Sequence, residues 1–123
     1  MKTAILVALM GALGALARWQ TSVLANRYSD SLLPTGTIAV NLLGSFLLGL
    51  LMAISMAGTI PESWRVPLSA GLLGSFTTFS TFSVETVTLL QQGQARLALF
   101  NVVIQLMLGL AAAACGLTIG KSI

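Results

Sequence analysis

The sequence predicts an all-α membrane protein that forms a single domain over residues 1–123, with four helices that cross the bilayer. Hydrophobic residues make up 56% of the chain and charged residues only 7%, whereas about 25% of the residues in a soluble domain are charged. The hydrophobic residues gather in four segments, each close to the roughly 20 residues that a helix needs to cross a bilayer core. These segments cover about residues 3–24, 37–57, 68–90 and 97–119.

The first segment is apolar up to Arg18 and Trp19, a cation and an indole that suit a membrane interface. Its beginning also has the form of a secretory signal, with Lys2 before an apolar run and an Ala-Leu-Ala triplet after it. We expect no cleavage there, because cleavage would remove one of the four spans. The second segment holds no charge and one amide, Asn41, near its start. That amide has two open interpretations, a bridge between helices or a pore-lining group.

The third segment is unusual because Gly71 and Gly74 precede a run of hydroxyl and aromatic residues, Ser75–Ser83. In hydrocarbon each unsatisfied backbone polar group costs several kcal/mol, so a broken helix is tolerated only inside protein or beside a cavity. The glycines predict such a break, which would free carbonyl oxygens in the turn from Gly74 to Thr77. The alternative is that both glycines only permit close helix packing. The hydroxyl run beside them favours the break.

Two phenylalanines and three polar groups are the candidate anion ligands. The edge of an aromatic ring is positive, so Phe79 and Phe82 can face an anion without carrying a formal charge. The hydroxyls of Ser80 and Thr81 and the amide of Asn41 can donate hydrogen bonds to it. From spacing alone, ordinary core packing is the better interpretation for the two rings, and only the context of the motif makes them candidate ligands.

The fourth segment places Asn101, Gln105 and Gly109 on one helical face, which we expect to look inward. Glu85, near the end of the third segment, is expected to reach the interface like Arg18. The first, second and fourth segments hold no acidic residue, so the carboxylate that proton coupling would need at mid-membrane is not evident.

An even number of spans places both termini on one side of the membrane, and the positive residues then divide equally between the two sides. Lys2, Arg65 and Lys121 lie on the terminal side, and Arg18, Arg27 and Arg96 on the other. Positive residues normally fix the orientation of a membrane protein. Their balance predicts insertion in both orientations, so that the chain can pair with its own inverted copy.

Several functional classes are excluded by composition. The chain has no histidine and one cysteine, Cys115, so zinc clusters, Cys/His nucleophile pairs and internal disulfides are not expected. The net charge of +3 is spread singly along the chain, without the basic stripe that nucleic-acid binding requires. We therefore expect neither an enzyme nor a nucleic-acid-binding protein.

Three stretches of the chain resemble the Fluc (CrcB) family of bacterial fluoride channels. They are Gly11–Trp19 (GALGALARW), Asn41–Ser45 (NLLGS) and Gly71–Ser83 (GLLGSFTTFSTFS). The resemblance covers the length, the number of spans and the order of the motifs. The fourth segment departs from it, because the family usually has small hydroxyl or tyrosine groups where this chain has Asn101 and Gln105.

The resemblance implies a multi-pass protein of the bacterial inner membrane that forms an antiparallel, dual-topology homodimer with two fluoride pores. A central structural sodium ion would be held by the backbone carbonyls of Gly74 and Thr77 in each subunit. Phe79 and Phe82 would line the fluoride path, with Asn41, Ser80 and Thr81 alongside. Arg18 would face an aqueous vestibule and concentrate anions there.

The expected function is therefore passive export of cytoplasmic fluoride through a selective channel. Two alternatives from other classes remain. A small multidrug-type proton-coupled antiporter shares the length and the four spans, but it needs a carboxylate in the first segment. A structural subunit of a larger membrane complex would also be short and apolar, but it would not need the hydroxyl and phenylalanine run.

Overall fold

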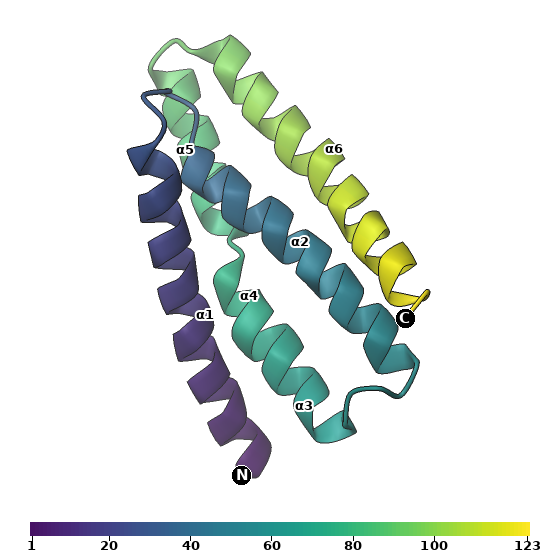
Figure 1. The fold of residues 1–123 in the computed structure, drawn as a ribbon. Coiled ribbons are helices and arrows are strands. Elements are labelled where there is room, and N and C mark those ends of the chain that lie inside the picture. The colour runs from purple at the N-terminus through teal and green to yellow at the C-terminus, as the bar shows by residue number, and fades with distance from the viewer.

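The computed structural model describes every residue from Met1 to Ile123, and its regular elements are all helical (Figure 1). The elements are α1 (Lys2–Arg27), α2 (Thr35–Met56), α3 (Glu62–Val66), the π-helical segment η1 (Pro67–Leu73), α4 (Gly74–Phe76), α5 (Phe79–Gln91) and α6 (Ala95–Gly120). The prediction of an all-α fold is confirmed. Both termini lie at the same end of the bundle (Figure 1), as an even number of spans requires.

Three helices, α1, α2 and α6, are long and apolar enough to cross a membrane alone. The remaining span is a composite: α3, η1 and α4 run in one direction to a break, and α5 continues beyond it (Figure 1). Only 21 of the 123 residues are buried, and large apolar side chains of α1 and α6 stand exposed, among them Leu9, Leu16, Leu99 and Val103. An apolar surface of this extent is suited to lipid or to another protein. The chain is a multi-pass membrane protein.

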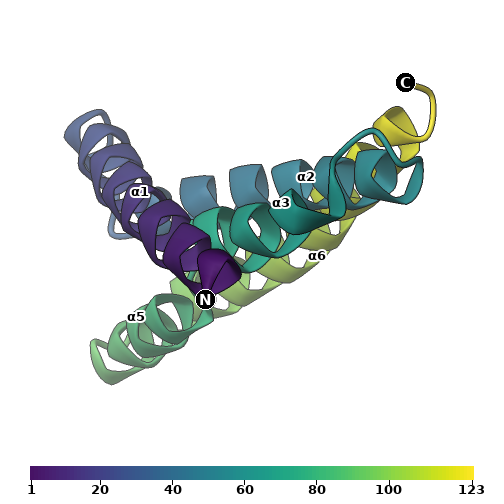
Figure 2. The ribbon, with the colours of Figure 1, turned by 90° about the horizontal axis from the view of Figure 1, so that it is seen from below.

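Glycines let the helices approach closely, as in many membrane bundles. A side chain on Gly14 of α1 would overlap the carbonyl of Leu72, and one on Gly116 of α6 would overlap the carbonyl of Phe46 in α2. These contacts pack α1 against η1 and α6 against α2. Seen from below, α1 and α5 diverge from the group formed by α2, α3 and α6 (Figure 2).

The turn between α1 and α2 is fixed by one side chain. The Oδ1 atom of Asn26 accepts hydrogen bonds from the Thr35 hydroxyl at 3.2 Å and from the Gly36 N–H at 3.1 Å. The first N–H groups of a helix have no partner within the helix, so Asn26 of α1 caps α2. This contact ties the start of α2 to the end of α1.

Candidate functional site

The third span is broken at two consecutive threonines. Thr77 (φ −84°, ψ 162°) and Thr78 (φ −153°, ψ 113°) are extended, whereas the residues on both sides are helical. The break therefore falls after the two glycines and not at them. Gly71 lies within η1 and serves close packing, because a side chain there would come within 3.0 Å of Met10 and of the Val7 carbonyl. The sequence interpretation placed the break correctly in the motif but attributed it to the wrong residues.

The break redirects two backbone N–H groups. In a continuous α-helix the Thr78 N–H would donate to Gly74 and the Thr81 N–H to Thr77. Instead, the Thr78 N–H donates to Oδ1 of Asn41 at 2.8 Å, and the Thr81 N–H donates to the Thr78 hydroxyl at 3.2 Å. The carbonyls of Gly74 and Thr77 are thereby released from their α-helical partners. These are the two carbonyls that the family resemblance singled out.

The hydroxyls of the motif divide into two groups. Those of Thr77 and Ser83 donate to carbonyls four residues earlier, those of Leu73 and Phe79, which is the ordinary behaviour of such residues in helices. The hydroxyl of Thr78 instead lies at the centre of a cluster of hydroxyl groups at the start of α5. It donates to the Thr81 hydroxyl at 2.9 Å and lies 3.3 Å from that of Ser80.

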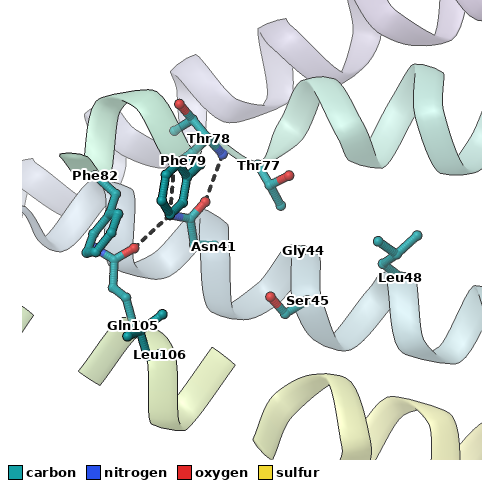
Figure 3. A pocket seen from close by; sticks show the side chains of 10 residues that line it. All are labelled: Asn41, Gly44, Ser45, Leu48, Thr77, Thr78, Phe79, Phe82, Gln105 and Leu106. Carbon is teal, nitrogen blue, oxygen red and sulfur yellow. Dashed lines mark hydrogen bonds between the residues drawn. The ribbon is translucent and has the colours of Figure 1, made fainter. Parts of the chain in front are cut away.

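A cavity of about 240 Å³ opens beside the break, between α2, α5 and α6 (Figure 3). Asn41, Phe79 and Phe82 all line it, so the structure brings together three of the predicted anion ligands. The two rings stand 5.5 Å apart between centroids and are inclined by 49°. Phe82 is only 8% exposed, whereas Phe79 is 75% exposed.

The other two predicted ligands lie outside this cavity. Ser80 and Thr81 are exposed and meet the cavity only through Thr78, to which both are hydrogen bonded. The cavity contains three polar residues that the sequence interpretation did not assign to the site, Ser45, Thr78 and Gln105. Gln105 could have been found from its inward-facing position on the fourth segment, since the structure confirms that it and Asn101 are buried.

Asn41 is the centre of the polar contacts. Its Nδ2 group donates to the Thr78 carbonyl at 3.0 Å and to Oε1 of Gln105 at 2.6 Å, while its Oδ1 accepts from the Thr78 N–H. An amide nitrogen has two hydrogens, and both are used here. Asn41 therefore clamps the broken helix to α2 and α6, and its interpretation as a bridge between helices holds in this structure.

Two charged side chains lie near the site. Nη1 of Arg18 donates to the Thr77 carbonyl across 3.4 Å, so this half-buried guanidinium reaches the helix break. Glu85 of α5 accepts a hydrogen bond at its Oε1 from the Thr37 hydroxyl at 2.8 Å, and its Oε2 is buried without a partner. It lines a cavity with Ser31, Leu32 and Pro34, next to the loop between α1 and α2, and its reach to the interface stays a prediction.

The geometry defines a class of protein: a helical, multi-pass membrane protein with a polar cavity at an interrupted span, an arrangement typical of channels and transporters. The family model described as CrcB-like protein, Camphor Resistance (CrcB), matches residues 5–117. The chain belongs to this family.

Curated relatives are similar in sequence to this chain over most or all of its length. A "Fluoride-specific ion channel FluC 2" from Symbiobacterium thermophilum is 47% identical over 86% of this chain and 87% of its own. A "Fluoride-specific ion channel FluC" from Magnetococcus marinus is 44% identical over 95% of this chain and 96% of its own. One from Geobacter sp. is 39% identical over 100% of both chains. The relatives are named as ion channels, which confirms the prediction that this chain is not an enzyme.

Proposed function

We propose that the chain is a passive, fluoride-selective channel that lets fluoride leave the cytoplasm and so lowers its internal concentration. The observation that carries the proposal is the cavity at the helix break, which joins two phenylalanine rings to amide and hydroxyl groups. The full-length relatives named as fluoride-specific ion channels support the same function.

The chemistry of the cavity suits a small, strongly hydrated anion. A selective pore must replace the water shell of the ion and still release it. Ring edges, hydroxyls and amides supply partial positive charge, and no lysine or arginine lines the cavity. A fixed cation there would bind fluoride more strongly and slow its release.

A passive pore is sufficient for export. Fluoride enters cells as neutral HF, which dissociates at the higher internal pH, and a negative membrane potential then drives the anion outward. The cavity is lined by no carboxylate. In a bacterium this function places the chain in the inner membrane.

The break itself argues for a second copy of the chain. Gly74, Phe79, Ser80 and Thr81 surround it and are all exposed. Irregular backbone at membrane depth must be covered by protein or line a water-filled cavity. An antiparallel homodimer would cover both breaks at once, and the even division of positive residues permits the inverted insertion that such a dimer needs.

A structural sodium ion fits the same place. The released carbonyls of Gly74 and Thr77 are hard oxygen ligands of the kind that hold sodium at unwound membrane helices, and two copies would supply four. Arg18 competes for one of them, since its guanidinium contacts the Thr77 carbonyl. The distance of 3.4 Å is long for a charge-assisted hydrogen bond, so this contact is weak enough for an ion to replace.

The sodium proposal predicts that removal of sodium dissociates the dimer into monomers or slows fluoride efflux. Replacing sodium by N-methyl-D-glucamine during purification should yield monomers in light scattering or slow fluoride efflux, and adding sodium back should restore the dimer. Potassium at equal ionic strength is the control. Unchanged mass and efflux in samples shown to be free of sodium would contradict the proposal.

The channel itself is tested with purified protein in liposomes that contain potassium fluoride or potassium chloride. Valinomycin opens a path for potassium, and ion-selective electrodes then measure each anion outside. We expect rapid fluoride release, little chloride release, and no release of either from protein-free liposomes. Absence of fluoride release from verified dimers would contradict the proposed function.

One observation bears on a second candidate, a small multidrug-type proton-coupled antiporter: the buried Oε2 of Glu85 has no partner, but Glu85 lies in the third span and not in the first, where that class needs its carboxylate. Glu85 lines a different cavity from Phe79 and Phe82. With valinomycin present, a proton-coupled antiporter would take up protons in a fixed ratio to the fluoride that it releases, so the external pH would rise as fluoride appears. A channel should release fluoride without such proton uptake.

A further inference from the structure

A chain of hydrogen bonds runs from the helix break through α2 and α6 to α5. Asn41 donates to Oε1 of Gln105 at 2.6 Å, and Nε2 of Gln105 donates to Oδ1 of Asn101 at 2.9 Å. Nδ2 of Asn101 then donates to the hydroxyl of Thr86 at 2.9 Å, which donates to the carbonyl of Phe82 at 2.7 Å. The chain thus starts beside Phe79 and ends on the backbone of Phe82.

The direction of this chain is fixed at its first member. Asn41 faces both main-chain groups of Thr78, accepting from the N–H and donating to the carbonyl. A main-chain N–H can only donate and a carbonyl can only accept, so the two ends of the Asn41 amide cannot be exchanged. Since Nδ2 then faces Gln105, the Gln105 oxygen must face Asn41, and the nitrogen must face Asn101.

Counting the hydrogens shows which amide can serve an anion. Both hydrogens of the Asn41 nitrogen are used within the protein. The nitrogen of Gln105 makes one hydrogen bond, to Asn101, which leaves its second hydrogen without an acceptor in the chain. Gln105 lines the cavity beside Phe79 and Phe82 (Figure 3), and only 8% of its surface is exposed.

We propose that Gln105 is a specificity-determining residue that offers its free amide hydrogen to the anion, and that Asn101 is the positioning residue that orients it. The oxygen of Gln105 is held at Asn41, away from the anion, so this amide presents a donor and not an acceptor. A site arranged in this way favours an anion over a cation. The inference rests on the proposed function, and it assigns the amide contact to α6 instead of to Asn41.

The orientation resists reversal because two hydrogen bonds enforce it. If the Gln105 amide turned over, its nitrogen would face the Asn41 nitrogen and its oxygen would face the Asn101 oxygen, so both hydrogen bonds would be lost. Asn101 is fully buried, and a buried polar group without its partner is costly. Asn101 therefore holds the Gln105 donor in place without contacting the anion.

The test compares substitutions at Gln105 in the liposome assay. Gln105→Glu keeps the shape and the acceptor for Asn41 but removes both hydrogens, and Gln105→Met keeps the length without any donor. Each is expected to slow fluoride efflux by about tenfold or more, because a hydrogen bond to an ion is lost. Gln94→Glu, at the exposed start of α6, makes the same charge change and should leave efflux unchanged.

Asn101→Leu tests the positioning role. The protein should still release fluoride, but with a lower ratio of fluoride to chloride, because the Gln105 amide can then turn. A merely structural residue would change the yield of folded dimer and not this ratio.

Wild-type protein in the same assay distinguishes failure of the proposed channel function from failure of the role of Gln105. If it releases no fluoride, the proposed function fails. If it releases fluoride and folded Gln105→Met is equally fast or faster, the role of Gln105 is overturned, because Asn41 then supplies the donor. Gln105→Met carries no charge, so it decides the question even if Gln105→Glu does not fold.

Discussion

Phe79→Ile is expected to reduce fluoride efflux by about tenfold or more without loss of folded protein. Isoleucine keeps an apolar side chain but has no ring, so it cannot present the positive edge that an anion contacts. Phe79 is 75% exposed in the chain, so its loss removes little packing within the subunit. A fall in efflux would therefore report on the ring itself. The rate is measured with the fluoride electrode after valinomycin addition.

Phe82→Ile should reduce efflux to a similar extent, with an additional loss of stability, because Phe82 is 8% exposed and belongs to the core. Phe100→Ile is the matched control, since Phe100 lies on α6, is 48% exposed and does not line the cavity. Normal efflux by both Phe79→Ile and Phe82→Ile would remove the rings from the anion path. Loss of efflux in either variant with an intact dimer would exclude a purely structural subunit.

Gly14→Ala is expected to destabilise the folded protein by about 1–3 kcal/mol, the usual range for overpacking. A methyl group there would overlap the carbonyl of Leu72, so α1 must move away from η1. Alanine is intrinsically better than glycine in a helix by about 1 kcal/mol, so destabilisation would have to come from the packing. Thermal unfolding in detergent and the yield of monodisperse protein measure the effect.

The control is Gly109→Ala on α6, where the nearest atom to an added methyl group is the Ser45 hydroxyl oxygen at 3.9 Å, an ordinary contact. This variant should be as stable as the wild type or slightly more stable. If Gly14→Ala were equally stable, the close approach of α1 to η1 would not be needed for the fold. Because α1 carries Arg18 to the Thr77 carbonyl, movement of α1 should also disturb the break.

The sequence was sufficient for the parts of the fold that depend on local composition. Long apolar segments must form helices in a membrane, since the backbone has no water to bond with, and this determined the all-helical architecture. The spacing of Asn101 and Gln105 was enough to place both on an inward face. The motif also indicated that the third span is interrupted, and the sequence named Asn41, Phe79 and Phe82 as candidate anion ligands, which the structure brings together beside the interruption.

The tertiary structure decided where the interruption falls and which polar groups are free. The break lies at Thr77 and Thr78 because the N–H of Thr78 finds its partner on Asn41, a residue 37 positions earlier in the chain. Both hydrogens of the Asn41 nitrogen are used, one by the Thr78 carbonyl and one by Gln105. The nitrogen of Gln105 on α6 therefore holds the free donor. The partners in these hydrogen bonds are distant along the chain, and a sequence pattern reports only residues that are close together. Which amide keeps a free hydrogen at the cavity is therefore settled by the packing of α2, α5 and α6.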